Sequence, residues 1–161
     1  MAQTSPMLHM VCGKIAAGKS TLCAKLGASA GPIVISEDDW LGALFADQMK
    51  DGADFMRCSA KLRTAMVPHV SALLTAGLTV VLDFAANTVA QRKWMLDVAR
   101  ASHAGHQLHY LDVSDAVCLE RLRARNAEGH HAFAATEAQF RRFTALFVPP
   151  TEDEGLNIVH H

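Results

Sequence analysis

A glycine-rich run near the start of the chain constrains the fold more than any other feature. It matches the pattern of Gly, four residues and Gly-Lys-Ser/Thr without a mismatch, and is followed by Thr21: Gly13-Lys14-Ile15-Ala16-Ala17-Gly18-Lys19-Ser20. In such a loop the backbone N–H groups surround phosphate oxygens, the lysine reaches the β- and γ-phosphates, and the hydroxyl ligates Mg²⁺. We therefore expect residues 13–21 to bind a nucleoside triphosphate and Ser20 to hold the metal ion.

The residues on either side of this run have the patterns that such a loop requires. Residues 7–12 are mostly apolar, as in a buried parallel strand. The apolar residues of segment 22–26 fall on one face of a helix. Because that helix begins inside the motif, its positive N-terminal end faces the anion. A turn that only joins a strand to a helix would not require Lys19 and Ser20.

Strand-like and helix-like segments alternate along the rest of the chain. Strands are expected at residues 7–12, 33–35, 78–82, 107–113 and 156–159. Helices are expected at 62–74, at 88–102, from Ser114, and from Thr136 or Ala138. Pro68 should kink or break the first of these helices. The alternation predicts an α/β fold of three layers, in which helices cover both faces of a parallel sheet and ligands bind beyond the C-terminal strand ends.

Length and composition indicate one globular domain. The 161 residues suffice for a single core, and we expect residues 1–161 to form one domain. The net charge of −1 and the lack of a basic block give no support for binding nucleic acid or a membrane surface. The first six residues do not resemble a signal peptide, and the four cysteines form no CxxC pair. We expect a cytoplasmic protein with free, buried thiols.

Three acidic residues follow the second predicted strand, one strand away from the phosphate loop. They are Glu37, Asp38 and Asp39. A carboxylate here can accept a proton from an acceptor hydroxyl or hold Mg²⁺ through water. Since neighbouring side chains diverge, the three cannot all face one site. One of them could instead cap the helix that begins near Trp40.

A short apolar run ends in Asp83. This is the Walker B pattern, a strand that ends in an aspartate beside the phosphate loop. Asn87, Thr88 and Arg92 follow it. We expect Asp83, Asn87 and Arg92, together with Asp39, to contact the substrate. A simple N-cap role for Asn87 or Thr88 is the alternative.

An arginine-rich segment precedes a glycine and two histidines, Gly129-His130-His131. On a helix Arg121 and Arg125 share one face, and Arg123 points elsewhere. We expect a lid around residues 121–135 that closes over ATP, excludes water and neutralises charge on the transferred phosphate. A solvated basic helix face is the alternative. A second group, His103, His106 and His109, has regular spacing, but Gly105 and a predicted strand intervene, so we predict no metal site there.

Four segments of the chain together resemble the small P-loop kinase-like ATP-binding proteins. They are the phosphate loop, Ser-Glu-Asp-Asp-Trp at 36–40, Val-Val-Leu-Asp-Phe-Ala-Ala-Asn-Thr at 80–88 with Arg92, and Arg-Leu-Arg-Ala-Arg-Asn at 121–126. That group includes zeta-toxin-like kinases, chloramphenicol phosphotransferase and polynucleotide kinase. The resemblance covers nearly the whole chain and implies a five-stranded sheet of order 2-3-1-4-5, ATP with Mg²⁺, and an arginine-bearing lid.

The resemblance also implies roles for individual residues. Asp38 takes the place of the catalytic base, and Leu41 stands where an arginine is common. Arg125, supported by Arg121, matches the lid arginine. Residues 149–152 resemble the segment that lies near the adenine.

We therefore predict an ATP-dependent phosphotransferase that moves the γ-phosphate to a hydroxyl of a small-molecule acceptor, with no membrane partner. Its catalytic residues would be Lys19, Asp38, Arg121 and Arg125. One alternative is an ATP-binding and ATP-hydrolysing switch module that acts on a protein partner. Another is a polynucleotide 5′-hydroxyl kinase, which the near-neutral charge disfavours because phosphate contacts need clustered Lys and Arg.

Overall fold

The structure is a computed structural model that describes residues 5–129 and 134–161. The strands of this part form one parallel sheet of five strands in the order β2-β3-β1-β4-β5, which confirms the predicted order. They are β1 (Met7–Cys12), β2 (Ile33–Ser36), β3 (Val80–Ala85), β4 (Gly105–Tyr110) and β5 (Ile158–His160). The α-helices are α1 (Lys19–Gly27), α2 (Glu37–Phe45), α3 (Gly52–Thr75), α4 (Val89–Ala101), α5 (Asp115–Glu128) and α6 (Glu137–Ala145). Two short 3₁₀ turns are η1 (Ala46–Gln48) and η2 (Glu152–Glu154).

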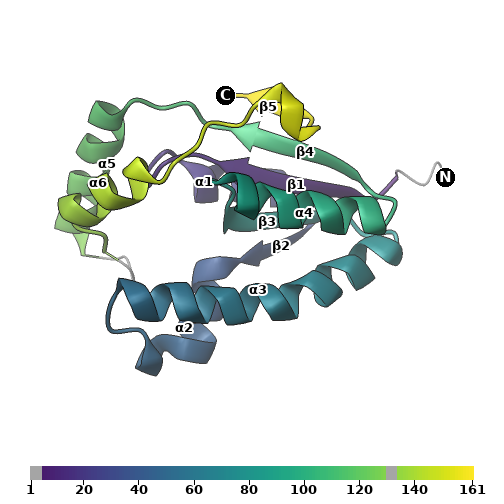
Figure 1. Ribbon diagram of the computed structural model, residues 1–161, viewed down its shortest axis with the longest axis horizontal. Coiled ribbons are helices and arrows are strands. Elements are labelled where there is room, and N and C mark those ends of the chain that lie inside the picture. Colours follow the sequence, from purple (N-terminus) through teal and green to yellow (C-terminus); the bar gives the residue numbers. More distant parts are fainter. Residues whose placement is uncertain (1–4, 130–133) are drawn as a thin grey trace.

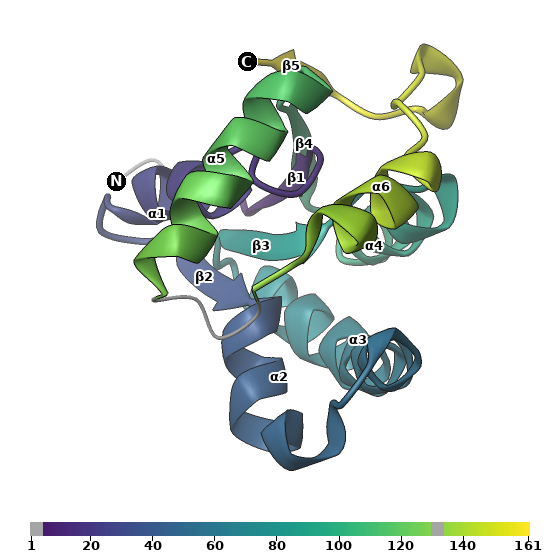
Figure 2. The same ribbon diagram turned by 90° about the vertical axis from the view of Figure 1, so that its left-hand side faces the viewer.

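Helices lie on both sides of the sheet, as the alternation predicts. Figure 2 shows α1 on one side and α3 and α4 on the other. The larger core lies on the α3 and α4 side, where Leu8 and Leu82 from the strands pack with Met95 of α4. Residues that alternate with these along the strands point to the opposite face, so Val81 packs there with Cys23 of α1.

Four strands, β2 to β5, have boundaries that differ from the predicted ones, and two of these differences bear on the site. β3 continues to Ala85, so Asp83 lies within the strand and pairs in register with Ser36 of β2. β4 ends at Tyr110, because the chain then turns into α5, where the side chain of Ser114 accepts a hydrogen bond from the backbone N–H of Val117. Ser114 is therefore the N-cap that the sequence predicted.

Helix α3 is continuous through Pro68, so the predicted break is wrong (Figure 1). It also begins ten residues before the apolar pattern does, at the N-cap Asp51, whose side chain accepts from the N–H of Asp54 at 2.8 Å. Proline removes one helical hydrogen bond. The helix persists because Pro68 is exposed, while Met66 and Val70 on either side of it are buried in the core.

The phenylalanines of α6 and of the segment after it differ in burial. Phe140 is buried, Phe147 is partly buried, and Phe143 is 36% exposed. All four cysteines are free and buried, as predicted. No helix in the described part of the chain is long and apolar enough to cross a membrane.

Candidate active site

The phosphate loop links β1 to α1 at the C-terminal edge of the sheet. Gly18 is the N-cap of α1 with a φ of 103°, a left-handed conformation that favours glycine. No side chain among the described residues caps this helix end, so its N–H groups remain free to receive an anion. At Gly13 a Cβ would lie 3.2 Å from the carbonyl oxygen of Leu111, so a side chain there would crowd the β4 end.

Lys19 holds this loop in shape. Its Nζ donates to the carbonyl oxygens of Gly13, at 2.7 Å, and Lys14, at 2.8 Å. Burial lowers the pKa of Lys19, and the neighbouring Asp83 carboxylate acts in the opposite direction. The ammonium group thus contacts the loop carbonyls directly and is close enough to the Asp83 carboxylate of β3 to interact with it electrostatically.

The loop is tied to helix α5, which carries the arginines of the predicted lid. Nζ of Lys14 lies 2.6 Å from a carboxylate oxygen of Asp115, at the start of α5. One turn and a half further on, Nη1 of Arg121 donates to the carbonyl oxygen of Ala17 at 3.3 Å. These contacts fix the first half of α5 against the phosphate loop.

A cavity of about 970 Å³ opens above the loop, a size typical of ligand sites. Several of the predicted site residues line it: Ile15, Ala16, Ala17, Gly18, Lys19, Ser20, Thr21, Asp38, Asp83, Arg121 and Arg125. The others do not: Gly13, Lys14, Asp39, Asn87 and Arg92. The structure thus brings together residues from the phosphate loop, the start of α2, β3 and α5.

Asp38 lies where positive and negative charges meet. Burial raises the pKa of Asp38, and the carboxylates of Asp83 and Asp39 raise it further. Lys19 and Arg125 lower this pKa, so both cations act on the same carboxylate. A carboxylate with a raised pKa is a better proton acceptor than an isolated aspartate.

Glu37 also lines the cavity, although the sequence offered no reason to prefer it to its two neighbours. Its carboxylate accepts a hydrogen bond from the hydroxyl of Ser59 on α3. Burial raises the pKa of Glu37, and the Ser59 hydrogen bond opposes that rise. The helix cap is Ser36, which accepts from the N–H of Asp39 at 3.2 Å, so the acidic trio forms the first turn of α2.

Asn87 acts on the phosphate loop instead of lining the cavity. Its Oδ1 accepts the backbone N–H of Gly13 at 2.9 Å. Thr88 is the N-cap of α4 and forms a capping box with Gln91, whose Oε1 accepts the N–H groups of both Asn87 and Thr88. The expected substrate contact of Asn87 is thus replaced by a contact that fixes the start of the loop.

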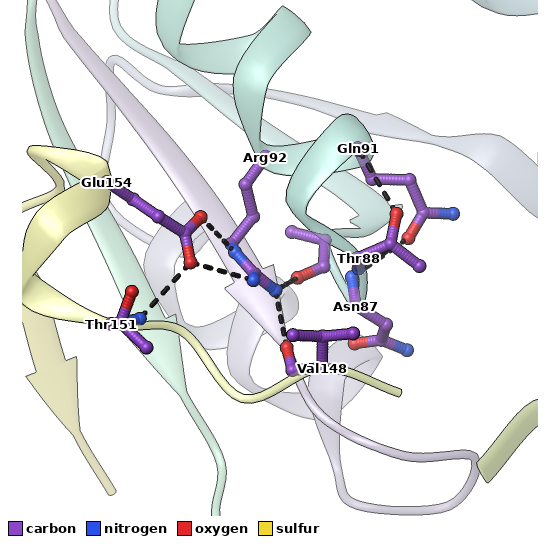
Figure 3. Close-up of polar contacts among 8 residues, drawn as sticks. Asn87, Thr88, Gln91, Arg92, Val148, Thr151 and Glu154 are labelled. Atoms are coloured by element: carbon purple, nitrogen blue, oxygen red, sulfur yellow. Dashed lines mark hydrogen bonds and ion pairs between the residues drawn. The ribbon is translucent and has the colours of Figure 1, made fainter. Parts of the chain in front are cut away.

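Arg92, which was expected to contact substrate, does not line the cavity. Its guanidinium group points toward Glu154 and Val148 (Figure 3). It has no exposed surface, and its Nε and Nη2 donate to the carboxylate of Glu154 at 2.7 and 2.8 Å. Its Nη1 donates to the carbonyl oxygens of Ala86 at 3.1 Å and Val148 at 2.8 Å. The guanidinium group thus makes four hydrogen bonds, which hold the segment before β5 and the end of β3 against α4.

That segment was expected near the adenine, from the resemblance of residues 149–152. These residues do not line the cavity. They lie between Val148 and Glu154, the two anchors on Arg92 (Figure 3). Their structural role is thus the attachment of the last strand.

The predicted lid is described only in part, because His130 and His131 lie outside the described residues. Within the described part, Arg125 lines the cavity, and its Nε is buried without a hydrogen-bond partner. A buried donor without a partner is costly unless a ligand satisfies it. Arg125 is therefore arranged to receive an acceptor such as a phosphate oxygen.

The described residues contain no group of three His, Cys, Asp or Glu side chains placed to hold a metal ion. His103, His106 and His109 do not come together. His103 follows α4 and is exposed, His106 accepts the N–H of Asn157, and His109 lies among other histidines.

Comparison with known proteins identifies the wider group. A family model described as an AAA domain matches residues 8–150. A search of the curated proteins found no match.

Several solved structures share the fold. A candidate kinase from Chloroflexus aurantiacus has a TM-score of 0.77 and 19% identity, over 98% of this chain and 85% of that chain. A sugar kinase from Janibacter sp. has a TM-score of 0.67 and 13% identity, over 98% and 85%. Kti12 from Chaetomium thermophilum, in complex with ADP-AlF3, has a TM-score of 0.68 and 14% identity, over 96% and 89%.

Proposed function

This chain belongs to the AAA domain family (AAA_33), and from that premise we propose that it is an ATP-dependent phosphotransferase acting on a small-molecule hydroxyl. The coarser description, a P-loop kinase-like protein with a nucleotide-binding loop, follows from the family and the fold. The transfer reaction, its acceptor and the roles of single residues are the proposal.

One observation supports the proposal more than any other. Asp38 lines the same cavity as the phosphate loop, and its carboxylate interacts with both Lys19 and Arg125. A module that only binds a nucleotide needs the loop and its lysine. A carboxylate with a raised pKa beside the phosphate site is what transfer to a hydroxyl also requires.

The reaction follows from these positions. The loop N–H groups and Lys19 bind the phosphates of ATP, and Arg121 and Arg125 neutralise the charge that develops on the transferred group. The acceptor oxygen attacks the γ-phosphorus as its proton passes to Asp38. The bond between the γ-phosphorus and the β,γ-bridging oxygen breaks, and ADP leaves.

The residues present also fit Mg²⁺, which prefers oxygen ligands. Ser20 and Asp83 both line the cavity and would hold the ion. When bound, it would neutralise phosphate charge and orient the γ-phosphate.

We further propose that residues 121–135 act as the lid of a single domain. The contacts of Lys14 and Arg121 fix the first half of α5, whereas Arg125 lines the cavity and its buried Nε has no hydrogen-bond partner among residues 5–129 and 134–161. Closure would bring this arginine onto the γ-phosphate and exclude water.

A test measures ATP consumption by the pure protein in Mg²⁺, with and without a deproteinised small-molecule extract of cells. Consumption that rises sharply with extract, and transfer of label from γ-³²P-ATP to a small molecule, would support the kinase. Lys19→Ala is the control and should abolish both. Tight ATP binding with no stimulation would contradict the proposal and favour a switch that acts on a protein partner.

A further inference from the structure

Three histidines form a hydrogen-bonded chain across neighbouring strands. Nδ1 of His9, on β1, lies 3.1 Å from Nε2 of His109, on β4. Nδ1 of His109 lies 2.9 Å from Nε2 of His161, which directly follows β5. The backbone fixes the last ring in this place, because the N–H of His161 donates to the carbonyl oxygen of Tyr110 at 3.0 Å. The phosphotransfer mechanism uses none of these three groups.

The two inner rings of this chain, His9 and His109, are neutral at neutral pH. His109 is 5% exposed, and burial together with the two neighbouring imidazoles lowers the pKa of His109 to about 4. Burial also lowers the pKa of His9. With one N–H on each ring, the chain can vary only in which nitrogen of each ring holds the proton.

Only two arrangements of these protons satisfy both hydrogen bonds. In one, Nδ1–H of His9 donates to Nε2 of His109, and Nδ1–H of His109 donates to Nε2 of His161, so the proton of His161 is on its Nδ1. In the other, Nε2–H of His161 donates to Nδ1 of His109, and Nε2–H of His109 donates to Nδ1 of His9. Nδ1 of His161 then has no proton and is an acceptor. The remaining ring nitrogen of His161 is thus a donor or an acceptor according to the state of the whole chain.

His161 lines the cavity and directly follows β5, the edge strand on the opposite side of the sheet from β2. The phosphate loop follows β1, the middle strand. Asp38 and Asp83 belong to the β2 and β3 side, where the acceptor must lie if Asp38 is the base. The γ-phosphate then faces that side, and the nucleobase must extend toward β4 and β5, where Leu111 and His161 line the cavity.

We propose that His161 hydrogen-bonds the edge of the nucleobase, and that the chain from His9 through His109 sets whether it donates or accepts. The proposal rests on the proposed function, both on its nucleotide binding and on the place of Asp38 as the base. Adenine presents an amino donor at the position where guanine presents a carbonyl acceptor. With adenine His161 accepts at Nδ1, and with guanine it donates, so the site binds both purines.

Equilibrium binding of ATP, GTP and inorganic tripolyphosphate to the full chain provides the first test. ATP and GTP should bind within about tenfold of each other, because the chain can adopt either arrangement. His161→Ala should weaken both by about 2- to 10-fold, the effect of losing one neutral hydrogen bond, and leave tripolyphosphate binding unchanged. His160→Ala is the matched control, since His160 is exposed and does not line the cavity, and should change none of the three.

The second test follows the protons directly by ¹⁵N NMR of the imidazole rings, with the His9 signals assigned through His9→Gln. Bound ADP should leave Nδ1 of His9 without a proton, and bound GDP should place a proton there. Tripolyphosphate should not alter the His9 tautomer. This measurement does not require turnover, and the observed His9 ring is separated from the nucleobase by the rings of His109 and His161.

The inference would be overturned if His161→Ala weakened tripolyphosphate binding as much as it weakened ATP and GTP binding. ATP and GTP affinities that differ by more than a hundredfold, or the same His9 tautomer with ADP and GDP, would also overturn it. Normal nucleotide binding with no effect of His161→Ala would reject this inference alone. Failure of the native chain to bind any nucleotide would reject the proposed function as well.

Discussion

Glu154→Ala should destabilise the protein strongly, although Glu154 lies outside the proposed active site. The substitution removes the two hydrogen bonds from Arg92, of 2.7 and 2.8 Å, and the one from the N–H of Thr151, of 3.1 Å (Figure 3). It leaves the guanidinium of Arg92 with no exposed surface and no anion. Removing one partner of a buried ion pair costs about 3–5 kcal/mol. We expect the lower end, about 3 kcal/mol, because the Glu154 side chain is 13% exposed and Arg92 keeps its bonds to two carbonyl oxygens.

Urea unfolding followed by circular dichroism measures this loss, and for a chain of this size it corresponds to a fall of about 6–12 °C in Tm. Glu152→Ala is the matched control, because Glu152 is exposed, lies in the same 3₁₀ turn and forms no ion pair within the described residues. Adding Arg92→Met to Glu154→Ala should recover part of the loss, since no buried charge then remains unpaired. A loss below about 1 kcal/mol, or one equal to that of the control, would refute the reasoning.

The same pair predicts a pH dependence with a definite sign. The hydrogen bond from Arg92 lowers the pKa of Glu154 in the folded state. The pair therefore stabilises the fold fully above the unfolded carboxyl pKa, about 4.3, and this contribution is lost as pH falls through the lower folded pKa. The difference in unfolding free energy between the native chain and Glu154→Ala should be constant above about pH 5 and shrink below it. A difference that grows in acid would contradict the assignment.

Further predictions concern the site itself. Asp38→Asn should reduce turnover by about 10²–10⁴-fold while ATP still binds. Asp39→Asn should have little effect, because Asp39 does not line the cavity. Steady-state kinetics of both variants checks this, and the reverse pattern would assign the base to Asp39. Gly18→Ala should cost about 1–2 kcal/mol of unfolding free energy, because its φ of 103° disfavours a side chain, although the nearest atom is 3.6 Å from the added Cβ. Gly42→Ala adds the same methyl group within helix α2, where nothing lies within 4 Å, and should stabilise the protein by about 0.5–1 kcal/mol in the same unfolding assay.

Several features of the fold could be predicted because their causes are local in sequence. The phosphate loop needs residues at fixed offsets between a strand and a helix, and all of them occur between Gly13 and Ser20. Ser114 and Thr136 could be recognised as helix starts because a cap bonds an N–H only three residues away. The exact strand ends could not be predicted, because they depend on pairing with neighbouring strands, as for Asp83 opposite Ser36.

The sequence by itself determined the fold class and the loop that binds phosphate, because periodicity and motif spacing act over a few residues. The sheet order followed only from the resemblance of its motifs to a known family. Only the tertiary structure decided what Arg92 does, since its partner Glu154 is 62 residues away and comes beside it through the placement of the segment before β5. The same holds for His9, which meets His109 across 100 residues because β1 and β4 are neighbours in the sheet. Such contacts depend on strand order and register together, and no pattern of adjacent residues encodes them.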